Sequence, residues 1–171
     1  MKTLTHVVMV TMILAMSIKP VMAKKPTHKH ASSHQVKSKT LEQYISKMCK
    51  RNCVNANHLN KAVYQASRRH KVPANLIKAV MKVESRFKRT ASSKGNYGLM
   101  QVNYTAHRNE VSKDELLNVE SNIDIGAGIL SKCLVDAHNN IMKALECYKG
   151  NDSPGYKQEV KKALIVIASL N

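Results

Sequence analysis

From residue 40 onward, apolar side chains recur every three or four positions, which is the spacing of amphipathic helices. We expect a short helix to begin at Thr40, and a second helix, capped by Asn57, to close in the basic run 68–71. Pro73 suits the first turn of a third helix, which should run to about Phe87. No segment predicts a strand convincingly, so the pattern indicates an all-α fold.

The remainder of the chain is also divided into helices and turns. Residues 88–111 are rich in Ser, Gly and Asn and predict a structured loop with a short helical turn at 99–103. Ser112 and Glu115 have the spacing of a capping box, which predicts a short helix after them. Longer helices are expected from Asn118 or Ser121 to about His138, and at 140–148 and 155–170.

The first 23 residues have the pattern of a secretory signal peptide. Lys2 supplies a positive start, residues 7–18 are almost entirely apolar, and Val21-Met22-Ala23 resembles a cleavage site, so cleavage is predicted after Ala23. An uncleaved membrane anchor is the alternative, although the run is shorter than the ~20 apolar residues of a typical span. We therefore expect export to the periplasm or cell envelope, with no stable membrane span after cleavage.

Residues 24–39 contain five Lys, three His and no acid, together with almost no large apolar group. Such a segment cannot offset the entropy of ordering its backbone, which predicts a basic flexible tail. The remaining residues, 40–171, then form a single domain of ordinary size.

The charge of the chain favours an anionic partner. Lys and Arg total 28 against 11 Asp and Glu, which gives +17. Because residues 1–23 carry only Lys2 and Lys19, the cleaved chain keeps +15. Such a field draws anionic polymers or surfaces toward the protein. Nucleic acid is not expected as a partner, since export removes it from cytosolic targets and one Phe with no Trp leaves little for base stacking.

Four cysteines are expected to meet an oxidising compartment. Of the three possible pairings, Cys49–Cys53 with Cys133–Cys147 is preferred, because each pair is close in sequence and lies near a predicted turn. A zinc half-site formed by Cys49, Cys53 and His58 is the alternative. Its second half is missing from the sequence, so we expect no metal.

One acidic residue lies on the apolar stripe of the third predicted helix. Counting by three and four from Val80 and Met81 leads to Glu84, near the end of that helix. Burial disfavours a charged carboxylate and raises its pKa, which suits a general acid. The alternative is a carboxyl at the edge of the stripe that reaches solvent or pairs with an arginine, and periodicity alone leaves both interpretations open.

The segment around this glutamate, ESRFKRTASSKGNYGLMQVN at 84–103, resembles the signature of the family 1 lytic transglycosylases. That signature has a Glu-Ser pair, an Ala-x-Ser-x-x-Gly loop and Gly-Leu-Met-Gln, and all three are present in order. Later motifs fit as well, and the resemblance covers roughly 60–168. The matching residues are Glu84-Ser85, Ala91 to Gly95, Gly98-Leu99-Met100-Gln101, Asn122-Ile123 with Gly126 and Leu130, and Ala144-Leu145 with Tyr148 and Gly150.

The resemblance implies an all-α, goose-type-lysozyme-like transglycosylase (SLT) domain that uses no cofactor and no metal. Glu84 would protonate the glycosidic oxygen between N-acetylmuramic acid and N-acetylglucosamine, then accept a proton from the muramoyl C6 hydroxyl. That hydroxyl would attack C1 and leave a 1,6-anhydro product. No second acid lies between Arg86 and Asn109, which favours this reaction over hydrolysis by two carboxylates.

The resemblance also implies roles for neighbouring residues. Tyr148 would hydrogen-bond Glu84, with half-buried packing as its alternative, and Ser93 would orient the carboxyl or a sugar. Asn122 is equally suited to a helix cap or a contact. Lys149 stands where the family usually has Asn, and Tyr97 replaces a commonly small residue. The residues expected to line the sugar groove are Met100, Gln101 and Asn103, with Gln101 bonding N-acetyl groups.

The expected partner is the glycan strand of peptidoglycan. The Tyr-Gly-Leu-Met-Gln-x-Asn form at 97–103 resembles the small exported members that accompany secretion systems, conjugation machinery or phages, so a local opening of the wall for such a machine is expected. The alternatives are a goose-type muramidase that hydrolyses the same bond, a non-catalytic wall-binding assembly module, and a secreted basic antimicrobial or nucleic-acid binder, for which the sequence lacks aromatic residues suited to base stacking.

Overall fold

The computed structural model describes residues 40–170, and the chain is helical over most of this range. The predicted signal peptide (1–23) and basic tail (24–39) lie outside the described residues. The elements in order are a helical segment at 40–48, α2 (Ala56–His70), α3 (Ala74–Ser85), α4 (Tyr104–His107), α5 (Lys113–Leu117), α6 (Val119–Asp136), α7 (Ile141–Lys149) and α8 (Pro154–Ala168).

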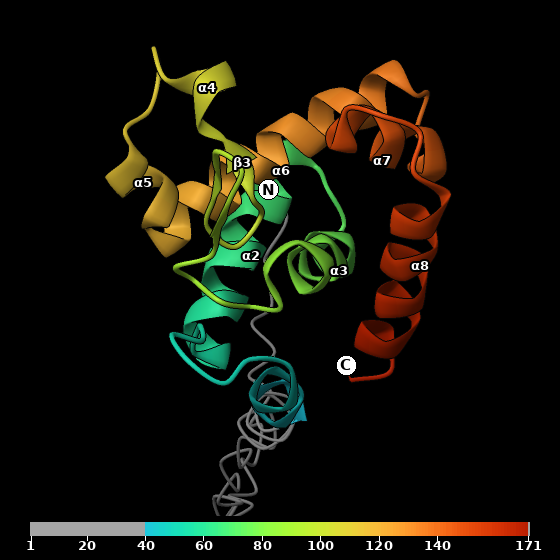
Figure 1. Ribbon diagram of the computed structural model, residues 1–171. Coiled ribbons are helices and arrows are strands. Elements are labelled where there is room, and N and C mark those ends of the chain that lie inside the picture. The colour runs from blue at the N-terminus through green and yellow to red at the C-terminus, as the bar shows by residue number, and fades with distance from the viewer. Residues whose placement is uncertain (1–39, 171) are drawn as a thin grey trace, which may run out of the picture.

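Helix α3 lies at the centre of the domain, with α8 packed against it and α2 packed against α6 (Figure 1). Helix α7 packs on α6 and connects this layer to α8. Ile77, Val80 and Met81 of α3 are completely buried, as the apolar stripe of the sequence predicts. The predicted all-α fold class is therefore confirmed. None of the helices within 40–170 has an apolar stretch long enough to cross a bilayer.

The helix starts follow their capping residues, with one correction. The cap of α2 is Asn55, whose Oδ1 accepts from the N–H groups of Asn57 and His58, so the expected cap at Asn57 is wrong. Because Ala56 packs into the core, the helix begins before Asn57. The capping box of Ser112 is confirmed, and Asn118 rather than Ser121 caps α6.

Helix α3 ends at Ser85, two residues earlier than predicted, because Arg86 and Phe87 both adopt left-handed backbone angles (φ 52° and 64°). This turn drives the Phe87 ring into the core, where it is fully buried and meets Tyr44 edge-on at 6.1 Å between ring centroids. The last turn of α3 is thereby anchored close to Glu84.

The loop that follows contains a small antiparallel sheet that the sequence did not predict. Its strands are β1 (Ser92–Ser93), β2 (Asn96–Tyr97) and β3 (Val102–Asn103), paired in that order. Two-residue strands are too short to leave an alternating pattern. The expected helical turn at 99–103 is wrong, because Gln101 has a φ of 51° and closes a turn on the carbonyl of Gly98.

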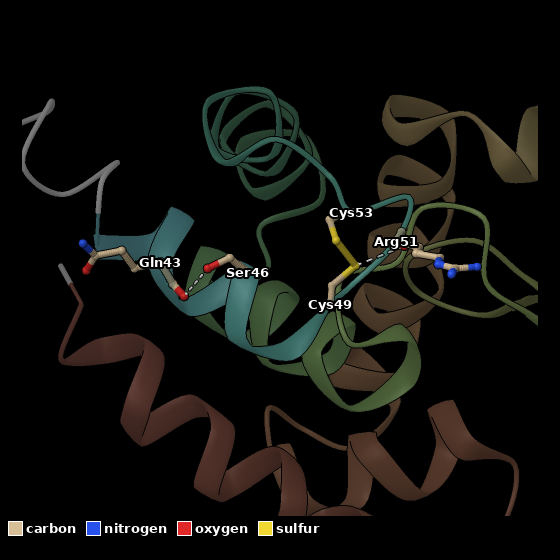
Figure 2. Close-up of a disulfide and its surroundings, with 5 residues drawn as sticks. All are labelled: Gln43, Ser46, Cys49, Arg51 and Cys53. Atoms are coloured by element: carbon tan, nitrogen blue, oxygen red, sulfur yellow. Dashed lines mark hydrogen bonds between the residues drawn. A yellow bond between two sulfur atoms is a disulfide. The ribbon is translucent and has the colours of Figure 1, made fainter.

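Both preferred disulfides are confirmed. Cys49–Cys53 closes the loop after the helical segment at 40–48, and Cys133–Cys147 joins α6 to α7 (Figure 2 shows the first). Within residues 40–170, no group of three or more His, Cys, Asp or Glu side chains is arranged to hold a metal ion.

Candidate active site

Glu84 lies in the last turn of α3 and faces a cavity of about 370 Å³. Its side chain is only 10% exposed. Among the described residues, it is the only acidic side chain that lines this cavity. Periodicity left two alternatives open, and the structure shows part of each: the carboxyl is largely buried, and a lysine lies beside it. The polar residues that share the cavity with it include Gln101, Asn103, His107, Tyr148 and Lys149.

Opposing influences act on the Glu84 carboxyl. Burial raises its pKa, because the charged form loses solvation. The Tyr156 hydroxyl and the Lys149 ammonium lower that pKa, and Lys149 Nζ lies 3.8 Å from Glu84 Oε2. Burial outweighs both, so the pKa remains above its ordinary value. The carboxyl therefore keeps its proton to higher pH than an exposed glutamate does.

The tyrosine that interacts with Glu84 is not the expected one. Tyr148 donates its hydroxyl proton to the carbonyl oxygen of Met100 at 2.9 Å, so the expected hydrogen bond from Tyr148 to Glu84 is wrong. Tyr148 still lines the cavity, and burial together with the charge of Glu84 raises its pKa. Its bond to Met100 ties α7 to the loop that forms one wall of the site.

Tyr156 of α8 provides the second hydroxyl near the carboxyl. The residue is 8% exposed, and its hydroxyl oxygen is buried without a hydrogen bond of regular geometry among the described residues. Its pKa is raised by burial first and by the Glu84 charge second. Lys149 Nζ lies 5.0 Å from the centre of its ring, a cation–π distance. No motif marks Tyr156 in the sequence, since only the packing of α8 on α3 brings it here.

The loop residues divide into those that line the cavity and those that do not. Gln101 and Asn103 line it, whereas Ser93 is exposed on β1 and lies outside the lining. The expectation that Met100 lines the groove is wrong, because its side chain is fully buried. It packs on Gly126 so closely that a Cβ there would come within 2.6 Å of Met100 Sδ.

The amides of Gln101 and Asn103 are partly engaged by the loop itself. Gln101 Nε2 donates to the carbonyl oxygens of Ala91 and Gly98, and Asn103 Oδ1 caps α4 by accepting from Ala106 N at 3.0 Å. These bonds hold the two side chains in place at the cavity wall. The direct sugar contact expected of Gln101 stays a prediction.

Asn122 of α6 fastens the loop to the helical core. It is 1% exposed, accepts from Met100 N at 2.8 Å, and donates to the carbonyl oxygens of Tyr97 and Leu116 at 2.9 and 2.8 Å. Neither role considered for it, cap or substrate contact, applies. A buried Asn that satisfies three backbone groups positions the cavity wall without touching the cavity.

Sequence patterns did not identify five further lining residues, namely Asn96 of β2, Val102 of β3, Ala106 and His107 of α4, and Ile129 of α6. They come from segments that are distant along the chain. His107 Nδ1 lies 3.8 Å from the exposed carboxylate of Glu110 at the rim. Nothing in their local sequence marks them, because folding alone brings them to the cavity.

Comparison with known proteins identifies a family that the chain resembles over most of the described domain. The family model described as the transglycosylase SLT domain matches residues 61–163, more than half of the chain and a range that includes Glu84, Gln101 and Tyr148. No curated protein and no solved structure matches the chain. The match and the helical architecture together confirm the predicted lysozyme-like fold class. The chain belongs to the transglycosylase SLT domain family.

Proposed function

We propose that this protein is an exported peptidoglycan lytic transglycosylase in which Glu84 is the single acid and base. The observation that carries the proposal is a largely buried carboxyl with a raised pKa, which is the one acidic group among the described residues that line its own cavity, in a member of this family. Such a group can deliver a proton at a pH where an exposed carboxyl is already ionised.

The reaction proceeds in two proton transfers. Protonated Glu84 gives its proton to the glycosidic oxygen as the bond from that oxygen to the muramoyl C1 breaks. The resulting carboxylate takes the proton of the muramoyl C6 hydroxyl, whose oxygen forms the new bond to C1. The product is a 1,6-anhydro ring, Glu84 ends protonated again, and no water is consumed.

Lys149 and Tyr156 act on the second half of this cycle. Both favour the ionised form of Glu84, so they stabilise the carboxylate that appears once the first proton has been transferred. Gln101, Asn103 and Tyr148 line the cavity around it and are proposed to contact the glycan. The local opening of the wall for a secretion, conjugation or phage machine is the proposed biological role, and export to the periplasm or envelope is part of it.

Product analysis tests the reaction. Peptidoglycan digested with the protein and examined by mass spectrometry should yield fragments with 1,6-anhydro ends, each lighter by one water than the hydrolysed form. Reducing ends would instead identify a muramidase, and intact glycan would favour an assembly module.

A substitution tests the residue. Glu84→Gln keeps the shape of the side chain and removes the transferable proton, so the turnover rate should fall about 10²–10⁴-fold. Glu159→Gln is the matched control, because Glu159 is exposed on α8 away from the cavity lining and should leave the rate unchanged. Full activity in a folded Glu84→Gln protein contradicts the proposal.

A further inference from the structure

A second cavity, of about 280 Å³, is formed where the C-terminal end of α3 meets the disulfide loop 49–53. Among the residues that the structure describes, its lining contains four exposed cationic side chains and no acidic one. Met48 and the buried Cys49 add an apolar wall. We name this cavity the cationic cleft and define it by Lys50, Arg51, Arg86 and Lys88.

The fold holds these like charges together. Val54 N donates to Phe87 O at 3.1 Å and Cys53 forms a β-bridge with Lys88, so the two cation-bearing segments are joined along their backbones. The disulfide closes the first segment on itself, and the Arg51 side chain extends away from it (Figure 2). Because like charges repel one another, holding these four cations together is electrostatically unfavourable, and a bound anion would relieve that repulsion.

The four cations of the cleft have no carboxylate partner in the described part of the chain. None of the ion pairs within residues 40–170 includes one of its four cations. Arg and Lys side chains bind carboxylates through charge-assisted hydrogen bonds, which Arg can make in a bidentate manner. Four such donors around one cavity therefore form a receptor for a carboxylate-bearing ligand.

The cleft is next to the candidate active site. Ser85 lines the cleft, whereas Glu84, the preceding residue, lines the catalytic cavity, so the two cavities flank the same helix end. In peptidoglycan, the muramic acid whose bond would be cleaved also carries a peptide stem with free carboxylates. An extended peptide covers about 3.3–3.6 Å per residue, so a stem extends well beyond the sugar that carries it.

We propose that the cationic cleft binds the carboxylates of these peptide stems and so selects glycan that still carries peptide. The proposal rests on the proposed function, because the glycan is what brings a stem to this position. The cleft thereby makes a contact that does not depend on the Glu84 chemistry.

The test compares two substrates and two charge-neutralising variants. The substrates are peptidoglycan with its stems and the same glycan after an amidase has removed them. The variant Arg51→Gln/Lys88→Gln removes two cleft cations, and Lys132→Gln/Lys162→Gln removes two exposed cations elsewhere as a matched control. We expect the cleft variant to raise KM roughly tenfold on stem-bearing glycan, with kcat unchanged. On stripped glycan, the KM of the cleft variant should equal the KM of the control variant.

Three outcomes overturn the proposal: an equal loss on both substrates, no loss on either, or a loss that the control variant reproduces. Sedimentation of Glu84→Gln protein with the two glycans measures the cleft without turnover. Stem-dependent binding there supports the cleft even if no anhydro product forms, so the two proposals fail separately.

Discussion

At the residue scale, the Glu84 carboxyl is buried against α7 and α8 while a lysine stands at its edge. The groups that face it are Lys149 and Tyr148 from α7 and Tyr156 from α8, with the Lys149 side chain 40% exposed. Burial favours the protonated acid and Lys149 favours the carboxylate. The proposed catalytic cycle needs both forms, so the balance between them should set the pH range of activity.

Replacing Lys149 by methionine should move that range upward. The pKa of Glu84 rises when the cation is lost, because only burial and Tyr156 then act on it. A general acid works in its protonated form, so the alkaline limb of the kcat/KM profile should shift to higher pH. The measurement is a pH–rate profile on glycan. Lys143→Met, also exposed on α7, is the control, and a limb that stays in place or moves to lower pH argues against this role.

The raised pKa of Glu84 also predicts a pH-dependent stability difference. A carboxyl with a higher pKa in the folded state stabilises the fold below its unfolded pKa of about 4.3, and this contribution is lost as pH rises through the folded pKa. Glu84→Gln removes the ionisation, so it should raise Tm at neutral pH and lose that advantage toward about pH 4. Thermal unfolding across this range checks it, and a variant whose Tm difference does not change with pH contradicts it.

At the scale of elements, the cavity wall depends on a loop that crosses α6 closely. Gly98 has a φ of 78°, and a Cβ there would lie 2.2 Å from Asn122 Nδ2 and from Leu116 O. Gly95 has a similar φ of 81° with open space around it. A side chain at Gly95 would therefore meet backbone strain alone, whereas a side chain at Gly98 would meet both backbone strain and a steric clash.

Substituting each glycine by alanine should give unequal losses. Gly95→Ala meets only the cost of the left-handed backbone, about 1–2 kcal/mol. Gly98→Ala adds displacement of Asn122 and its hydrogen bonds, so it should cost at least ~2 kcal/mol more. Urea unfolding measures both free energies. Equal losses would mean that Asn122 moves aside freely and does not hold the loop.

The disulfide between α6 and α7 is the second feature at this scale that holds the cavity wall in place. Cys147 directly precedes Tyr148 and Lys149, so the bond to Cys133 positions the part of α7 that reaches the cavity. Replacing both cysteines by alanine should lower the free energy of unfolding by about 3 kcal/mol, as expected for a loop of this length. Denaturant titration checks the value. A loss restricted to activity would indicate that α7 shifts while the fold stays intact.

At the scale of the whole molecule, the net positive charge should govern the proposed approach to an anionic wall, since 28 basic residues stand against 11 acidic ones. Raising the salt from about 0.1 M to about 1 M shortens the Debye length from roughly 10 Å to roughly 3 Å. The rate on stem-bearing peptidoglycan at low substrate should therefore fall steeply, while the rate at saturation should change little. The stripped glycan keeps one lactyl carboxylate on each muramic acid and therefore carries less charge, so it is the control substrate. Equal salt sensitivity of both substrates contradicts electrostatic steering by the stems.

Much of the fold is local and could be predicted. The periodic stripes of α2, α3, α6 and α8 mark their buried faces, and the capping box of α5 marks its start, since each depends on residues a few positions apart. The disulfide pairing followed from sequence proximity as well. The wrong predictions concern positions where a tertiary contact overrode a local preference. Met100, for example, was expected to line the groove and is instead buried in the core.

The sequence by itself determined the helices, the family motifs and the one acidic residue placed on an apolar stripe, because these are recorded in short-range spacing. Only the tertiary structure decided what surrounds that acid. Packing of α8 on α3 brings Tyr156 to Glu84, and the bond from Tyr148 to Met100 removes the partner that the motif suggested. Electrostatic environment is a property of distance in space, and residues far apart in the chain acquire it only when the core closes.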